Sequence, residues 1–289
     1  MSAHNNFDLV LFVLPALILI ITMVELPFVM NIYYSFTKWN GLDKIPVFIG
    51  IDNFIEAFGN SNFINALIFT FKYTFWVVIL TNVLAMAFAV ILDRPFRLKN
   101  IFRTIFFLPN VISLVVIGFM WRYIFTLGFQ ALYNLTQFEI FQWSWIGDYK
   151  LAWISMILVT VWQSVGYLMV IYIAGLQSIP QEVLESAEID GATGFSKFFT
   201  ITLPLVMPAV TVCVFLTLAN SLKVYDIVVA LTGGGPGDAT VSIAYNIFRE
   251  SIQNFRYGFG TAQSFIFFVI ILAVTSVQVR IFKKMEVES

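Results

Sequence analysis

Polar and ionisable side chains inside otherwise apolar stretches are the residues of this sequence best suited to chemistry. Lys223 and Asp226 lie three positions apart, so on a helix they would share a face and could pair. Asn220 and Tyr225 lie close to them in the sequence. An amide, a carboxylate and an aromatic ring together suit a neutral polyhydroxylated ligand, because polar groups bond hydroxyls while the ring supports an apolar face. A satisfied structural ion pair is the alternative interpretation.

A second group of candidates lies earlier in the chain. Gln163 offers another amide, and Trp162 and Tyr167 offer two more rings. Aromatic residues make up 17% of the chain, so most rings are expected to pack between helices, and packing remains the alternative for each of them. The candidate path for a ligand is the set Asn220, Lys223, Tyr225, Asp226, Gln163, Trp162 and Tyr167.

Common catalytic and metal-binding constellations cannot be assembled from this sequence. His4 is the only histidine and Cys213 the only cysteine, which leaves a His/Cys metal site or a Ser/His/Asp arrangement without support. The glycine-rich run 233–237 is followed by Asp238, so it predicts a tight turn and not a phosphate-binding loop. We therefore expect no enzyme activity, no metal and no cofactor in this chain.

The amino-acid composition indicates the environment of the elements that position these residues. The chain has 289 residues, of which 60% are hydrophobic and 11% charged. Soluble domains have about 45–50% apolar and about 25% charged residues, so the apolar excess predicts contact with membrane lipid. The formal net charge of -1 gives no basic field that would attract nucleic acid.

Six charge-poor runs predict an all-α membrane protein with six transmembrane helices, because in lipid each amide must bond within its own segment. We expect one transmembrane domain over residues 1–289 and a first run that is retained and not cleaved as a signal. The basic loop 93–103 and the basic C-terminal end predict that both termini are cytoplasmic. The predicted spans cover about 9–33, 67–92, 103–126, 151–175, 205–231 and 257–282.

The loop 178–204, between the fourth and fifth predicted spans, predicts a helix–turn–helix. Ser178 and Gln181 form a capping-box pattern ahead of a helix over about 179–190, and Gly191 marks its end because glycine tolerates positive φ. A second short helix is expected before Pro204 opens the fifth span. The first helix is acidic, so anionic lipid headgroups should repel it and docking on protein is favoured. An ordinary solvated loop is the alternative.

This loop resembles the EAA loop of ABC importer permeases. That motif has Glu-Ala-Ala, three residues, Gly, nine variable residues and Ile-x-Leu-Pro, and this chain has Glu185-Ser186-Ala187, Gly191 and Ile201-Thr202-Leu203-Pro204. Ser186 departs from the motif but is small enough to keep a close helix contact. The resemblance implies a coupling helix that inserts into a cleft of a partner ATPase. The residues it assigns to this coupling are Glu185, Ser186, Ala187, Asp190, Gly191, Ala192, Phe198, Leu203 and Pro204.

The resemblance covers nearly the whole chain and is to the maltose and glycerol-phosphate permease group. Segments 35–39, 106–109, 162–166, 174–177 and 225–236 are similar to that group as well. The resemblance implies a permease of the bacterial plasma or inner membrane that carries a carbohydrate, most simply an oligosaccharide. It also implies a second homologous permease subunit, ABC ATPase subunits that bind ATP and Mg, and an extracellular or periplasmic solute-binding protein.

Other functions remain open. Glycerol phosphate or a polyol is the alternative cargo, although an anion should require more buried cations than Lys223 alone. A secondary transporter would need paired half-repeats or an ion relay, and no clear repeat is visible. A membrane-embedded enzyme would need convergent catalytic groups within the spans.

Overall fold

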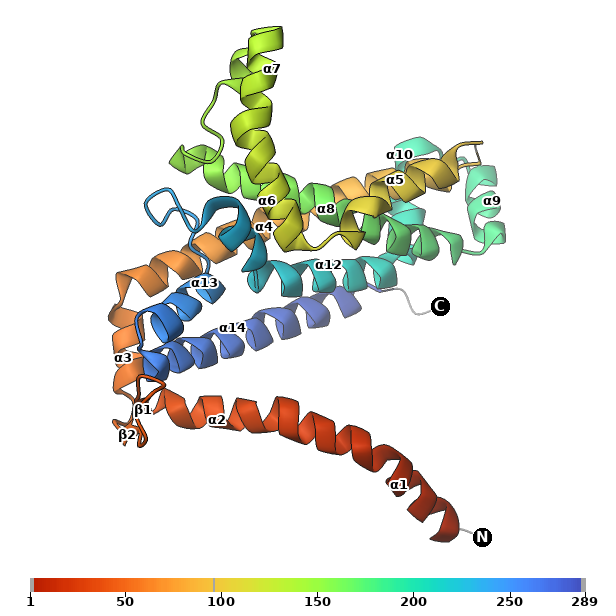
Figure 1. Ribbon diagram of the computed structural model, residues 1–289. Coiled ribbons are helices and arrows are strands. Elements are labelled where there is room, and N and C mark those ends of the chain that lie inside the picture. The colour runs from red at the N-terminus through yellow and green to blue at the C-terminus, as the bar shows by residue number, and fades with distance from the viewer. Residues whose placement is uncertain (1–2, 96, 287–289) are drawn as a thin grey trace. The chain divides into compact units, whose positions relative to one another are not determined.

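The computed structural model describes residues 3–95 and 97–286, with side chains from Phe12 onward (Figure 1). The chain divides into two compact units, each made of segments that are distant in the sequence. The first unit comprises Met1–Ile64 and Asn246–Val269, and the second comprises Asn65–Tyr245 and Ile270–Ser289.

Within the described residues, five helices are long and apolar enough to cross a membrane. A bent pair of helices, Gly194–Leu205 and Met207–Leu222, makes a sixth crossing if the pair is counted as one span. The chain is therefore the all-α, multi-pass protein that its composition predicts. The five helices are Phe12–Ser35, Ser61–Asp93, Leu114–Thr136, Tyr149–Gln177 and Tyr257–Lys283.

The N-terminal part of the first unit is a long helix followed by a hairpin. α1 (Ala3–Ile20), the π-helical turn η1 (Ile21–Glu25) and α2 (Leu26–Ser35) follow one another without a break. Strands β1 (Thr37–Lys38) and β2 (Val47–Phe48) then pair antiparallel, with Lys38 opposite Val47. Asn40 shapes the hairpin loop, because its side-chain oxygen accepts hydrogen bonds from the amides of Leu42 and Asp43. α3 (Asp52–Gly59) leads into α4 (Ser61–Asp93).

The C-terminal part of the first unit packs on this hairpin. It contains the end of α13 (Ile243–Phe248), the π-helical turn η6 (Arg249–Gln253) and the start of α14 (Tyr257–Lys283). Gly258 permits close packing, since a Cβ there would collide with the carbonyl of Thr37, and its amide donates to the carbonyl of Trp39 at 2.9 Å. The start of α14 is therefore held against the hairpin by backbone contact.

The second unit is a helical body built on α4 and α8 (Tyr149–Gln177). Buried apolar side chains from both helices form its core, including Tyr73, Val77, Met156 and Met169. α5 packs along α8, as Figure 1 also shows. The remaining elements are α5 (Lys99–Val111), α6 (Leu114–Tyr123), η2 (Ile124–Gly128), α7 (Phe129–Thr136), η3 (Glu139–Phe141), α9 (Gln181–Ile189), α10 (Gly194–Lys197), η4 (Phe198–Thr202), α11 (Leu203–Leu205), α12 (Met207–Leu222) and η5 (Val228–Thr232).

Three glycines allow close approach of the helices in this body. A Cβ at Gly166 of α8 would overlap the backbone of Phe106 in α5. A Cβ at Gly175 would lie 2.6 Å from the Cβ of Ala209 in α12. A Cβ at Gly118 of α6 would lie 2.5 Å from that of Ala230 in η5. Small residues at helix contacts are common in membranes, because packing there depends on close backbone approach.

The third predicted span, 103–126, is not one helix. Ile112 and Ser113 are extended, with ψ of 137° and 135°, so α5 ends at Val111 and α6 begins at Leu114. Pro109 lies in the last turn of α5 and lacks the amide that would continue its hydrogen-bond ladder. The apolar run itself carries no charge that would have marked this break.

The fifth predicted span, 205–231, is also interrupted. Pro204, which the sequence predicts to open this span, lies within the short helix α11. Pro208 is the proline in the first turn of the long helix α12. The chain bends by 74° between the two helical segments. α12 ends at Leu222, and Lys223 to Tyr225 form a non-helical connection.

Candidate functional site

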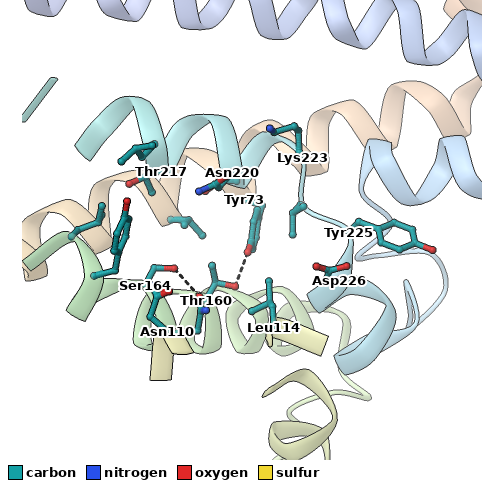
Figure 2. A pocket seen from close by; sticks show the side chains of 17 residues that line it. Tyr73, Asn110, Leu114, Thr160, Ser164, Thr217, Asn220, Lys223, Tyr225 and Asp226 are labelled. Atoms are coloured by element: carbon teal, nitrogen blue, oxygen red, sulfur yellow. Dashed lines mark hydrogen bonds between the residues drawn. The ribbon is translucent and has the colours of Figure 1, made fainter. Parts of the chain in front are cut away.

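A cavity of about 480 Å³ lies in the second unit where the two interrupted spans meet (Figure 2). Its walls come from α4, α8 and α12, together with the ends that flank the two breaks. Asn110 and Leu114 flank the break between α5 and α6, and Lys223 lies in the break after α12. We call this the helix-break cavity.

The location of this cavity is informative because non-helical backbone at membrane depth needs a polar environment. Broken helices are tolerated in membranes where the freed backbone groups are buried in protein or line a water-filled space. Here Lys223, Val224 and Tyr225 are non-helical and all line the cavity. The non-helical backbone groups of these three residues therefore lie beside a cavity with polar lining residues, as such groups require in a membrane.

Six of the seven predicted path residues line the helix-break cavity. Asn220 projects from the end of α12, and Tyr225 and Asp226 lie on the segment that follows, as Figure 2 shows. Trp162 is the exception, because its ring does not line the cavity and instead packs edge-to-face against Trp121 at 5.5 Å. The remaining predicted residues on the lining are Gln163, Tyr167 and Lys223.

The expected helical pairing of Lys223 with Asp226 is wrong. α12 ends at Leu222, so the two residues are not one turn apart on a common helix. Among the residues that the structure describes, no ion pair within 4 Å joins them. Both residues line the cavity and are exposed, and their opposite charges sum to zero.

Several polar residues of the lining were not among the predicted set. The hydroxyl of Tyr73 donates to Thr160 at 2.7 Å, which joins α4 to α8 across one wall. Ser164 donates to the side-chain oxygen of Gln163 at 3.1 Å and so orients that amide. Asn110 completes the lining near the first break. Single polar residues within apolar runs carry no distinctive spacing, so only the folded structure identifies them as part of the lining.

The loop 178–204 has an organised geometry of its own. α9 begins at Gln181 with Pro180 before it, and Ser178 donates to the carbonyl of Gly175 at 2.7 Å. The predicted capping box is therefore not formed, because the Ser178 hydroxyl completes the end of α8 instead. A salt bridge of 2.7 Å between Lys197 and Glu188 fixes α10 against α9.

Gly191 ends α9 in a Schellman motif. Its φ is +84°, and a Cβ built there would meet nothing within 4 Å. The amide of Gly191 bonds the carbonyl of Glu188 at 3.0 Å, and the amide of Ala192 bonds that of Ala187 at 2.9 Å. Glycine is required here by the backbone conformation and not by crowding.

Apolar side chains project from both short helices of this loop. Ile189 is 86% exposed and Phe195 is 84% exposed, and Glu185, four residues before Ile189 on α9, is exposed as well. Ala187 lies on the opposite face and is buried. Phe198 and Leu203 face a separate apolar groove of about 780 Å³, which Asn82 and Tyr172 also line.

Residues 81–287 match the model of the family described as the binding-protein-dependent transport system inner membrane component. The chain belongs to this family. The match contains the loop 178–204 and all of the predicted path residues. The resemblance noted from the EAA motif is thereby confirmed at the level of the family.

Two curated relatives span almost the whole permease. The probable starch degradation products transport system permease protein AmyD of Thermoanaerobacterium thermosulfurigenes is 38% identical over 280 residues, covering 96% of this chain and 94% of AmyD. The multiple sugar-binding transport system permease protein MsmF of Streptococcus mutans is 32% identical over 276 residues, covering 96% and 95%.

A solved structure has the same fold. The crystal structure of a bacterial ABC transporter involved in the import of the acidic polysaccharide alginate aligns with a TM-score of 0.83 at 21% identity, covering 97% of this permease and 96% of that chain. Among the described residues of the permease, no group of three or more His, Cys, Asp or Glu side chains could hold a metal ion.

Proposed function

We propose that this permease carries a neutral carbohydrate through the helix-break cavity, driven by a partner ATPase. The observation that carries the proposal is the meeting of two helix breaks around a polar cavity whose charges sum to zero, +1 from Lys223 and −1 from Asp226. AmyD and MsmF, which are named for starch degradation products and multiple sugars, support the same cargo class.

The cavity lining suits sugar hydroxyls. Asn220 and Gln163 each offer an amide donor and acceptor, Asp226 offers an acceptor, and Tyr225 offers a ring face. These groups are spread over α8, α12 and the segment after α12. Small relative movements of these helices would therefore change how many groups reach one sugar ring, which is what a transport site needs in order to release its cargo.

Coupling to ATP hydrolysis is assigned to the loop 178–204. Exposed Ile189 and Phe195 beside the acidic α9 form a surface of the kind that enters a protein cleft, since buried apolar anchors dominate such contacts. Gln177, at the end of α8, donates to Asp93 at the end of α4 at 2.9 Å. A pull on this loop would therefore be transmitted to two helices that line the cavity.

The assembly and orientation follow from the same proposal. The ATPase subunits bind ATP and Mg, a second homologous permease completes the path, and a solute-binding protein delivers the carbohydrate. The loop and both termini lie on the cytoplasmic side, because the basic loop 93–103 and the basic last turn of α14 lie there by the positive-inside rule. The protein itself hydrolyses no ATP.

An anionic cargo such as glycerol phosphate is the second candidate. The alginate importer, which shares the fold, handles an acidic polysaccharide. The helix-break cavity has one cation and one carboxylate, so it lacks the net positive charge that would offset an anion's desolvation. The neutral cargo is therefore favoured.

Affinity purification tests the assembly. The tagged full-length chain is solubilised from its native membrane in mild detergent, and co-purified proteins are identified by mass spectrometry. The proposal predicts a second permease and an ABC ATPase, and a co-captured binding protein that retains neutral glycans. Recovery of the chain without any ATPase, with transport driven by an ion gradient, would favour a secondary transporter.

A further inference from the structure

A second cavity, of about 450 Å³, lies entirely within the first unit. Its walls are formed by the hairpin loop, by α3 and by the segment that precedes α14. The cavity therefore lies close to the C-terminal end of α2 and the N-terminal end of α14. We call it the hairpin cavity. The lining residues used below are Lys38, Trp39, Asp43, Asn53, Glu56 and Arg256.

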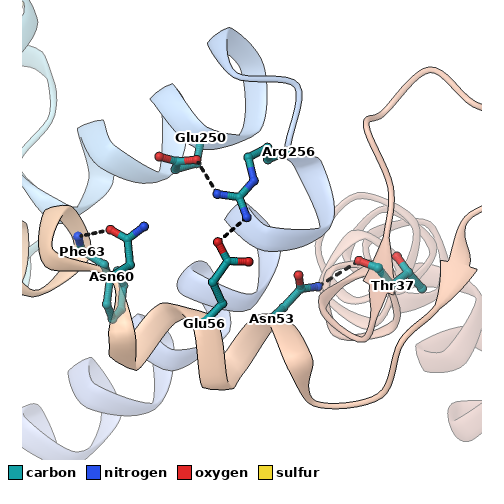
Figure 3. Close-up of polar contacts among 7 residues, drawn as sticks. All are labelled: Thr37, Asn53, Glu56, Asn60, Phe63, Glu250 and Arg256. Carbon is teal, nitrogen blue, oxygen red and sulfur yellow. Dashed lines mark hydrogen bonds and ion pairs between the residues drawn. The ribbon is translucent and has the colours of Figure 1, made fainter.

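Arg256 is fixed in the wall of the hairpin cavity from three sides. Its guanidinium contacts Glu56 of α3 at 2.5 Å and Glu250 of η6 at 3.6 Å, as Figure 3 shows. Glu250 is only 5% exposed, so this anchor lies behind the wall. The guanidinium carbon also lies 4.1 Å from the ring centre of Phe259. The Arg256–Glu56 pair is therefore presented in one orientation.

Trp39 is fixed by its neighbours in the same way. Its ring stacks on Tyr34 at 4.3 Å and meets Tyr257 edge-on at 5.1 Å. Its indole N–H donates to the carbonyl of Asp43 at 2.8 Å. An aromatic face whose position is already determined loses little conformational entropy when a ligand rests on it.

Asn53 contributes a hydrogen-bond acceptor, its side-chain oxygen, to the lining of the hairpin cavity. It is buried, and its amide nitrogen donates to the carbonyls of Ser35 and Thr37, each at 2.9 Å. These bonds use both amide protons and determine the side-chain orientation. The side-chain oxygen therefore remains available as an acceptor on the cavity lining.

The lining charges limit the ligand class. Lys38 and Arg256 lie on the lining with Asp43 and Glu56, and the buried Glu250 lies behind Arg256, so the cavity has no excess of positive charge. Lys38 and Asp43 are exposed and, among the described residues, neither side chain forms an ion pair within 4 Å. A fixed indole ring on the lining, surrounded by hydrogen-bond donors and acceptors, suits a neutral saccharide ring. The absence of excess positive charge on the lining does not suit an anion.

We propose that the hairpin cavity is a second saccharide-binding site, separate from the helix-break cavity. The hairpin and α3 join the first two spans, and the N-terminus is proposed to be cytoplasmic, so the site faces the outer surface. It holds cargo at the membrane surface before entry into the path. The ligand class rests on the proposed function, whereas the location rests only on the cavity.

Photo-affinity mapping tests this site. The full assembly, without its binding protein, is placed in lipid nanodiscs and labelled with diazirine-tagged maltotriose, cellotriose and xylotriose, with and without excess untagged sugar. Labelled peptides are mapped by mass spectrometry. We expect competed labelling within 38–56 and 255–259. K38A/D43A removes one charge of each sign and should reduce that labelling by about tenfold, a loss equivalent to two or three weakened polar contacts.

Two control variants separate the sites. K44A removes an exposed lysine of the same loop that does not line the cavity, so it should leave labelling unchanged. N220A should weaken labelling of the helix-break cavity alone. Competed labelling that is confined to the helix-break cavity, or unaffected by K38A/D43A, would overturn the second site while leaving the transport path intact. When the binding protein is added to the same assembly, protection of 38–56 together with no competed sugar labelling there would overturn the saccharide site and assign the cavity to protein docking.

Discussion

Tyr172 of α8 donates a hydrogen bond of 2.6 Å to the side-chain oxygen of Asn82 in α4. The amide of Asn82 donates in turn to Thr217 of α12 at 3.3 Å. Thr217 lines the helix-break cavity, whereas Asn82 and Tyr172 line the apolar groove beside the loop 178–204. These three side chains therefore connect the proposed cargo site with the region of the proposed coupling loop.

Removing the Tyr172 hydroxyl should destabilise the helical body. Y172F leaves the Asn82 oxygen without its donor, so we expect a loss of about 1–2 kcal/mol in the free energy of unfolding. Thermal denaturation of the purified assembly, followed by tryptophan fluorescence, measures the effect. Y149F is the matched control, because Tyr149 lies 63% exposed at the start of α8. Equal melting temperatures for the two variants would show that the hydrogen bond between Tyr172 and Asn82 does not stabilise the helical body.

Much of this architecture could be predicted from the distribution of charge. Runs without Asp, Glu, Lys or Arg overlap each long apolar helix, because burying a charge in lipid is costly whatever the fold. The third predicted span, however, covers only residues 114–126 of the helix Leu114–Thr136. The same signal could not show where a helix is interrupted within an apolar run. The breaks at Ile112 and Lys223 are backbone features that depend on surrounding packing.

The candidate site was predictable in its chemistry and less so in its geometry. Amides and carboxylates in apolar runs identified Asn220, Gln163 and Asp226, because such groups need a polar environment. Trp162 was misplaced because an aromatic ring packs equally well against another ring, and Trp121 is too distant in sequence for spacing to identify it. Whether an aromatic ring lines the cavity or packs on another ring depends on contacts between segments that are distant in the sequence.

The contact of α5 with α8 should tolerate no side chain at Gly166. G166A places a Cβ against the Phe106 carbonyl and should cost about 1–3 kcal/mol, because the backbone must shift to relieve the overlap. G128A is the matched control, since its nearest neighbour would lie 3.7 Å away. The yield of folded assembly by size-exclusion chromatography measures the difference, and similar yields of the two variants would argue against the close contact.

Strain introduced into the backbone at position 191 should disrupt coupling to ATP hydrolysis but leave insertion into the membrane intact. A β-branched residue resists a φ of +84°, so G191V should distort the end of α9 while the spans remain intact. We expect substrate-stimulated ATP turnover to fall by about tenfold or more, equivalent to about 1.4 kcal/mol at the coupling step. T193V is the control, because Thr193 is extended, with φ of −132°, and tolerates branching. Normal substrate-stimulated ATP turnover in a G191V assembly would contradict the proposed coupling role of the loop 178–204.

Removing the Asp226 carboxylate should change cargo preference. D226N shifts the sum of cavity charges from zero to +1, which favours an anionic cargo by on the order of 1 kcal/mol in a solvated site. Competition of neutral oligosaccharide uptake by a uronic-acid oligosaccharide should strengthen by about fivefold. E139Q alters an exposed carboxylate outside the cavity and should leave the competition unchanged. An unaltered preference in D226N would place cargo selection elsewhere.

The most direct test of the central claim is uptake in proteoliposomes. The chain is reconstituted with its co-purified permease and ATPase, and a labelled neutral oligosaccharide retained by the co-purified binding protein is supplied on the opposite side from ATP. The account predicts accumulation that requires both ATP and the binding protein and that falls in N220A with assembly unchanged. Accumulation by the chain alone under a proton or sodium gradient, independent of ATP, would contradict it.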